Sequence, residues 1–144
     1  MLRSMKKTLY WISTVVLAAL LLMGGVMDVL RAPPVVQAIT GLGYPAYLAS
    51  ILGVWKLLGL AAVTSPGLPR LKEWAYAGIA FDFSGAALSH AISGDPAAKV
   101  AVPLVLLGIA AASWALRPAS RRLGEVVPSA VAVPVASPVA ARAA

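Results

Sequence analysis

Residues 8–27 run without a single charged side chain. In a helix, about 20 apolar residues cross the roughly 30 Å hydrocarbon core of a bilayer. Three further segments of similar length and apolar character follow at residues 47–64, 74–92 and 98–116. The pattern predicts an all-α fold, a four-helix transmembrane bundle, whose membrane domain covers residues 8–116.

The overall composition also indicates a membrane location. Hydrophobic residues make up 60% of the 144 residues and charged residues only 12%, whereas a soluble domain has about a quarter charged residues. Soluble enzyme classes are therefore excluded. A cleavable signal peptide is the alternative for residues 8–27, with residues 36–38 as cleavage site, but the apolar run exceeds the roughly 7–15 residues of a signal core.

Basic residues are distributed unequally between the two sides of the predicted bundle. One side collects Arg3, Lys6, Lys7, Arg70, Lys72, Arg117, Arg121 and Arg122, and the other has Arg31 and Lys99. Because loops rich in Lys and Arg stay in the cytoplasm, both termini are predicted to be cytoplasmic, in a multi-pass protein of a bacterial inner membrane. The net charge of +7 favours lipid headgroups over nucleic acid as the anionic partner.

Three polar parts of the chain are predicted to face solvent. Residues 1–7 form a basic N-terminus, and Glu73 with Arg70 and Lys72 forms a solvated face. Residues 117–144 are rich in Ala, Val and Pro without a pattern that would build a core, so they are predicted to be a disordered tail.

Two charged residues lie inside predicted spans. Lys56 is in the middle of the second span and Asp82 in the middle of the third. A lone charge near the bilayer midplane costs about 2.5–3.5 kcal/mol on insertion scales, so each needs a partner. The two spans are joined by a short turn and both residues lie at similar distances from it, which predicts a Lys56–Asp82 ion pair. This pair is either a functional polar site or a structural link that sets the helix register.

Small residues share the predicted helix faces of this pair. They are Gly53, Gly59, Gly78, Gly85 and Ser89. Small side chains let membrane helices approach closely, so these residues are predicted to form a helix-packing seam inside the bundle.

A second polar site is predicted toward the outer side. Asp28 ends the first span and His90 lies near the end of the third, so both are expected at a similar depth. A carboxylate beside an imidazole favours proton exchange near neutral pH, which indicates a proton-handling pair. The alternatives are solvation of Asp28 at a helix end and an interfacial His90 bonded to Ser93 or to backbone.

The residue types present limit the chemistry of this chain. It has no cysteine, and His90 is its only histidine. Thiolate chemistry is therefore excluded, and two-histidine haem or zinc ligation needs a second subunit. The sequence assigns no catalytic residue, no metal site and no intrinsic cofactor.

Three stretches carry a family resemblance. They are Gly-Leu-Gly-Tyr-Pro-Ala-Tyr at residues 41–47, Gly-Val-Trp-Lys-Leu-Leu-Gly at residues 53–59, and the block at residues 71–90 that begins Leu-Lys-Glu-Trp-Ala-Tyr-Ala-Gly. Together they resemble the DoxX-like family of small bacterial membrane proteins, over roughly residues 6–116. The resemblance implies a four-helix membrane bundle.

The resemblance also suggests functions. Members of this family include a small subunit of a thiosulfate:quinone oxidoreductase, a partner in a membrane oxidoreductase complex linked to oxidative stress and, more distantly, an animal chaperone for receptor assembly. We expect a membrane subunit or quinone-proximal component of an oxidoreductase assembly, with Lys56 and Asp82 at the quinone. The alternative is a non-enzymatic scaffold or assembly factor with a membrane protein partner, in which the pair is structural. The third hypothesis is proton-coupled transport of a small solute by a homo-oligomer.

Overall fold

The computed structural model describes residues 2–124, with the side chains of Leu2 and Arg3 left out. Over this range the chain forms only helices. They are α1 (Leu2–Val29), α2 (Pro33–Gly41), α3 (Leu48–Thr64), α4 (Pro69–Ile92), α5 (Ala97–Ala115) and the short 3₁₀ turn η1 (Ala119–Arg121). The predicted all-α class is confirmed.

The four long helices coincide with the four predicted apolar segments. Two of them begin several residues before the predicted spans, α1 at Leu2 and α4 at Pro69. Pro69 occupies the first position of α4, where a missing backbone N–H removes no helical hydrogen bond. α4 therefore includes Arg70, Lys72 and Glu73, which lie before the predicted span of residues 74–92.

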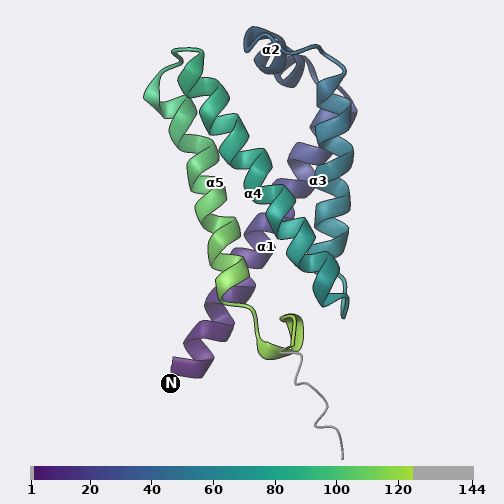
Figure 1. Cartoon of the computed structure of the whole chain (residues 1–144), viewed down its shortest axis with the longest axis vertical. Helices are drawn as coiled ribbons and strands as arrows, with labels where there is room; N and C mark the ends of the chain where they lie inside the picture. Colours follow the sequence, from purple (N-terminus) through teal and green to yellow (C-terminus); the bar gives the residue numbers. More distant parts are fainter. Residues whose placement is uncertain (1, 125–144) are drawn as a thin grey trace, which may run out of the picture.

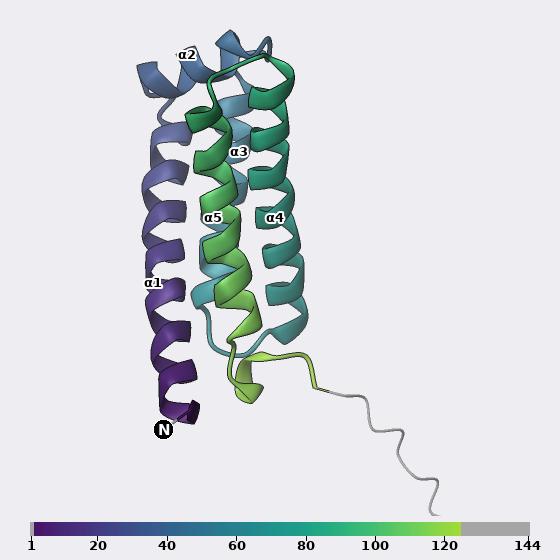
Figure 2. The same cartoon turned by 90° about the vertical axis from the view of Figure 1, so that its left-hand side faces the viewer.

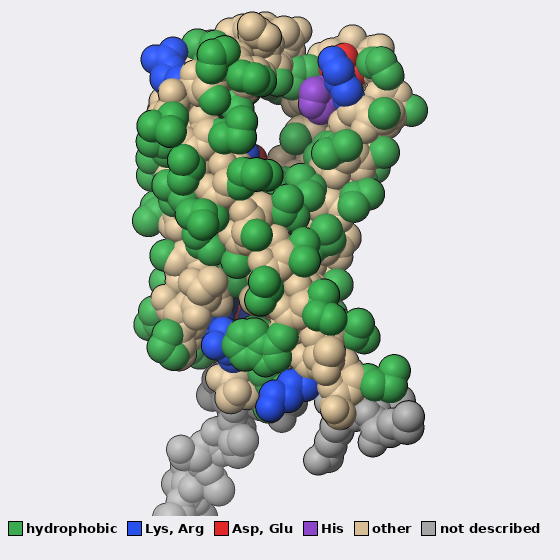
Figure 3. Space-filling model, turned by 180° about the vertical axis from the view of Figure 1, so that it is seen from behind, with side chains coloured by type: hydrophobic (Ala, Val, Ile, Leu, Met, Phe, Trp, Pro, Cys, Tyr) green, Lys and Arg blue, Asp and Glu red, His purple; other side chains and the backbone are tan. Residues whose placement is uncertain are grey.

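The helices are arranged as two pairs. α1 packs most extensively along α3, and α4 along α5. Figure 1 shows that the pairs splay apart toward the end at which α2 lies, and Figure 2 shows α2 crossing that end. In the space-filling view the surface is hollowed between the pairs near this end (Figure 3).

One apolar core joins all four long helices. It consists of Leu17, Leu21, Val63, Tyr76, Ile79, Phe83 and Ala110. Leu17 and Leu21 are one helical turn apart, so both project from the same face of α1 toward the other helices. The core therefore fixes the packing of both helix pairs against each other.

The outer surface of the bundle is apolar. Large hydrophobic side chains are exposed on every long helix, for example Val15, Trp55, Phe81 and Val105, and Figure 3 shows hydrophobic side chains along the whole length of one face. Exposed apolar surface on this scale marks contact with lipid or with other proteins. Two helical segments, Ser4–Val29 and Ala97–Ala115, are long and apolar enough to cross a membrane, and the apolar α3 is shorter, with 17 residues.

The chain stays ordered beyond α5. Arg117 is buried, and Arg122 donates hydrogen bonds to the carbonyls of Arg117 and Ala115 at 2.6 and 2.9 Å. The bond to Ala115 satisfies a carbonyl that α5 leaves free at its C-terminal end. Of the predicted disordered tail, residues 117–124 form these contacts, and residues 125–144 lie outside the described residues.

Candidate functional site

The end of α1 touches the second turn of α3 at a glycine. A Cβ atom built on Gly53 would lie 2.6 Å from the backbone nitrogen of Val29 and 2.8 Å from the Cβ of Asp28. Only glycine permits this approach. Lys56 follows Gly53 by about one helical turn, so its side chain projects from the same face of α3 and meets Asp28.

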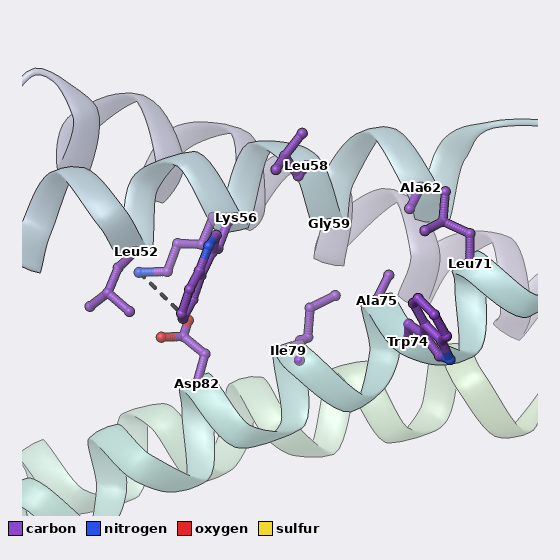
Figure 4. Close-up of a pocket in the computed structure, with 12 residues that line it drawn as sticks. Leu52, Lys56, Leu58, Gly59, Ala62, Leu71, Trp74, Ala75, Ile79 and Asp82 are labelled. Atoms are coloured by element: carbon purple, nitrogen blue, oxygen red, sulfur yellow. Dashed lines mark ion pairs between the residues drawn. The ribbon is translucent and has the colours of Figure 1, made fainter.

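Asp28, Lys56 and Asp82 form an ion cluster between α1, α3 and α4. The Lys56 Nζ donates to Asp28 Oδ2 at 2.7 Å and lies 3.7 Å from Asp82 Oδ2. The side chains of Asp28, Lys56 and Asp82 are 8%, 20% and 22% exposed. Figure 4 shows Lys56 reaching from α3 toward Asp82 on α4. The structure thus brings Lys56 and Asp82 together as the sequence indicates, but gives Lys56 a closer partner in Asp28.

Asp28 and His90 do not meet. α1 ends at Val29, where it packs against Gly53 in the second turn of α3. His90 lies near the far end of α4, where its Nδ1 is 2.7 Å from Asp95 Oδ2. The structure does not form the predicted Asp28–His90 pair, because Asp28 bonds Lys56 beside Asp82, whereas His90 lies about two helical turns further along α4.

Asp95 in the α4–α5 turn bonds two basic side chains. His90 bonds one carboxylate oxygen, and the Lys99 Nζ donates to the other at 2.7 Å. The hydrogen bonds from His90 and Lys99 hold the pKa of the Asp95 carboxyl below its usual value. His90 therefore ties the end of α4 to the α4–α5 turn, outside the ion cluster.

The residues of the predicted helix-packing seam have different surroundings. Gly53 lies in a tight helix contact, and a Cβ on Gly59 would meet Ile79 at an ordinary 3.7 Å. Gly78 and Gly85 have no atom within 4 Å of such a Cβ, so they do not pack against another helix. Ser89 shares a 2.9 Å hydrogen bond with the hydroxyl of Tyr44, which follows α2.

A groove of about 420 Å³ runs between α3 and α4, next to the ion cluster. Its lining consists of Leu52, Trp55, Lys56, Leu58, Gly59, Ala62, Leu71, Trp74, Ala75, Gly78, Ile79 and Asp82. Lys56 and Asp82 are its only charged lining residues (Figure 4). The unpacked Gly78 leaves space in the α4 wall. The groove is therefore an apolar surface with one polar end, the form of many small-molecule sites.

Lys72 is buried, contrary to the predicted solvated face. Its Nζ donates to the carbonyls of Ala62 and Val63 at 2.7 and 3.0 Å, and to that of Ser65. These carbonyls belong to the last turn of α3 and the residue after it. A cation is favoured there because the C-terminal end of a helix carries partial negative charge. A lysine shortly after a predicted helix end was the sequence signal for this role.

We expect Lys72→Met to lower the free energy of unfolding by about 2 kcal/mol, because hydrogen bonds to a charged group contribute about 1.5–3 kcal/mol and the carbonyls of Ala62, Val63 and Ser65 lose the Lys72 ammonium as donor. Arg70→Met is the matched control, because Arg70 lies two residues before Lys72 and is exposed. Denaturation in mixed micelles measures both variants. Equal stabilities of the two would contradict the capping role.

Two further polar contacts, absent from the sequence analysis, tie the helices together. Glu73 accepts hydrogen bonds from the Arg117 Nη2 at 2.7 Å and from the Trp114 Nε1 at 2.8 Å. Glu73 therefore links α4 to Trp114 and Arg117 at the end of α5, in addition to lying on the predicted solvated face.

The second contact is a chain of three hydroxyl groups. The Ser113 Oγ on α5 lies 2.7 Å from the Thr14 Oγ1 on α1 and 2.8 Å from the Tyr76 Oη on α4. All three side chains are buried, so each hydroxyl needs the bonds that the others supply. This chain links three helices without reaching the ion cluster.

Within residues 2–124, no three His, Cys, Asp or Glu side chains are grouped so that they could hold a metal ion. The ion cluster is a group of charged side chains between the helices of the described structure, and the groove lies beside it. A helical bundle with an apolar surface and charges enclosed between its helices has the architecture of a small membrane protein.

The chain belongs to the DoxX-like family, whose model matches residues 12–113. The match confirms the resemblance and includes the whole ion cluster and the groove. Comparison with curated proteins and with solved structures found no match.

Proposed function

We propose that this protein is a four-span membrane subunit that binds a quinone in the groove between α3 and α4 and works with an oxidoreductase partner. Both termini lie on the cytoplasmic side of the bacterial inner membrane. Support for the orientation comes from the basic residues, which gather at the end of the bundle formed by the α3–α4 turn and the end of α5.

The observation that carries the quinone proposal is the position of Lys56. Its ammonium group borders a groove whose other walls are apolar, and Asp82 borders it too. Of its three N–H groups, one bonds Asp28, which leaves donors for Asp82 and for a ligand. A quinone carbonyl accepts such a hydrogen bond, and a quinol hydroxyl can donate one to Asp82.

The rest of the groove suits the ring and isoprenoid chain of a quinone. Trp55 and Trp74, which are 66% and 77% exposed, line it together with leucines. Aromatic faces and aliphatic side chains supply contact area for a flat, lipophilic ring. The chain has no cysteine for redox chemistry, so its proposed role is to hold the quinone, and electrons come from the partner.

Filling the groove should abolish quinone binding. Gly78 lines the groove, and a Cβ added to it would have no atom within 4 Å, so Gly78→Leu places a side chain in the groove without a clash. We expect at least a tenfold loss of affinity for decylubiquinone, about 1.4 kcal/mol, measured by tryptophan quenching in nanodiscs.

Gly85→Leu is the matched control for this experiment. Gly85 is also on α4 and equally open, but it does not line the groove. It should bind decylubiquinone like the unchanged protein. Equal affinities of Gly78→Leu and Gly85→Leu for decylubiquinone would show that the quinone binds elsewhere and would contradict the proposed site.

The alternative is a scaffold or assembly factor with a structural ion cluster. The observation that favours it is the close Lys56–Asp28 pair beside the tight Gly53 contact, since a buried pair at a helix crossing can set the register. A scaffold predicts normal partner assembly in a stable variant that has lost the charges. Co-purification of membrane partners with that variant tests it.

A further inference from the structure

The ion cluster contains more negative than positive charge. Asp28 and Asp82 supply two carboxylates, and Lys56 supplies one ammonium, within 2.7 and 3.7 Å of them. With all three groups ionised, the cluster has a net charge of −1. All three side chains are largely shielded by the surrounding helices.

No other cation in the described structure neutralises this charge. α2 carries no ionisable side chain, and on α5 the one charged residue, Lys99, is bound to Asp95. On α4, His90 also bonds Asp95, while Lys72 bonds carbonyls at the end of α3. The hydroxyls of Tyr44 and Tyr76 bond Ser89 and Ser113. Arg31 follows α1 as an exposed residue.

A metal ion does not fit as the missing positive charge. Within residues 2–124, no three His, Cys, Asp or Glu side chains are placed to bind one, and hard cations need six or more oxygen ligands. A proton needs only one carboxylate oxygen. Where two enclosed carboxylates have a single counter-charge, one of them characteristically binds a proton.

We propose that the Asp28–Lys56–Asp82 cluster is a proton-binding site that holds one proton at neutral pH. The bound proton removes the net charge, which a bilayer would otherwise strongly disfavour. The inference rests on the membrane-spanning arrangement proposed above, but it does not depend on the identity of the ligand.

The proton decides which ligands suit the groove. With it, the cluster presents an ammonium and a carboxylic acid, both of which are hydrogen-bond donors. A neutral ligand with acceptor oxygens, such as a carbonyl compound, is then favoured over a cation. A quinone belongs to this class, and the cluster proton lies where a reduced quinone oxygen would need one.

Infrared spectroscopy of the full-length protein in bilayers, before any quinone is added, tests the proton site through the C=O stretch of a protonated carboxyl. We expect one such band at neutral pH. Asp28→Asn and Asp82→Asn should each abolish it, because either change leaves one carboxylate matched by Lys56. Asp95→Asn, which removes a carboxylate outside the cluster, should leave the band unchanged.

Three outcomes would overturn the inference. They are the absence of the band, its persistence in both cluster variants, and its appearance only after sodium is removed, which would identify a metal cation as the neutralising charge. Decylubiquinone binding is measured on the same bilayers. A band without quinone binding supports the proton site and rejects the proposed ligand, whereas quinone binding without a band does the reverse.

Discussion

Lys56→Met should lower the free energy of unfolding by about 3–5 kcal/mol, the cost of breaking a buried ion pair from one side. Methionine keeps the length of the side chain but removes the ammonium group that serves both Asp28 and Asp82. The charged carboxylate of the cluster then remains enclosed by apolar surroundings without a counter-charge. Denaturation in mixed micelles, with the abundance of folded protein in the membrane as a second readout, measures the loss.

The matched variant removes all three charges. Asp28→Asn with Lys56→Met and Asp82→Asn has no unpaired carboxylate, so it should recover most of the lost stability. Removing Lys56 and Asp82 alone would not suffice, because Asp28 is the closer partner of the lysine. If the Lys56→Met variant is as stable as the unchanged protein, the cluster is hydrated and contributes little to the free energy of unfolding.

The triple variant also separates the two proposed functions. If it is stable, assembles with its partners and supports their activity, the cluster is structural and the scaffold hypothesis is favoured. If it is stable but no longer binds decylubiquinone, the cluster belongs to the ligand site. A stable variant is needed for this comparison, since loss of activity in a misfolded one would distinguish nothing.

Gly53→Ala should be the most damaging single-methyl change in the bundle. The added Cβ would lie within 2.6–2.8 Å of atoms of Val29, Asp28 and Gly25, two of which are backbone atoms. Backbone cannot rotate away, so α1 and α3 must separate. We expect a loss of about 3 kcal/mol, at the upper end of overpacking, together with a longer Lys56–Asp28 distance.

Gly59→Ala, two turns further along α3, is the control for this experiment. Its Cβ would meet only the Ile79 side chain, at 3.7 Å. Alanine is favoured over glycine in a helix by up to about 1 kcal/mol, so this variant should be as stable as the unchanged protein or more so. Similar losses in the two variants would mean that the α1–α3 approach is not tight.

Much of the fold was predictable because it depends on composition over short windows. The apolar runs mark each long helix. The proximity of Lys56 and Asp82 could be predicted because they lie on consecutive antiparallel helices joined by a short turn. The described residues 117–124 escaped this reasoning because their order depends on contacts such as that of Arg122 with the end of α5.

The sequence by itself determined that the chain is helical and apolar, and that charges at Lys56 and Asp82 need partners, because hydrophobic runs and the cost of enclosed charge are local properties. Only the tertiary structure decided which residues those partners are. Asp28 reaches Lys56 because Gly53 lets α1 end against the second turn of α3, and Lys72 turns inward because α3 ends beside it. Such pairings depend on where helices stop and cross, which depends on the packing of the whole bundle.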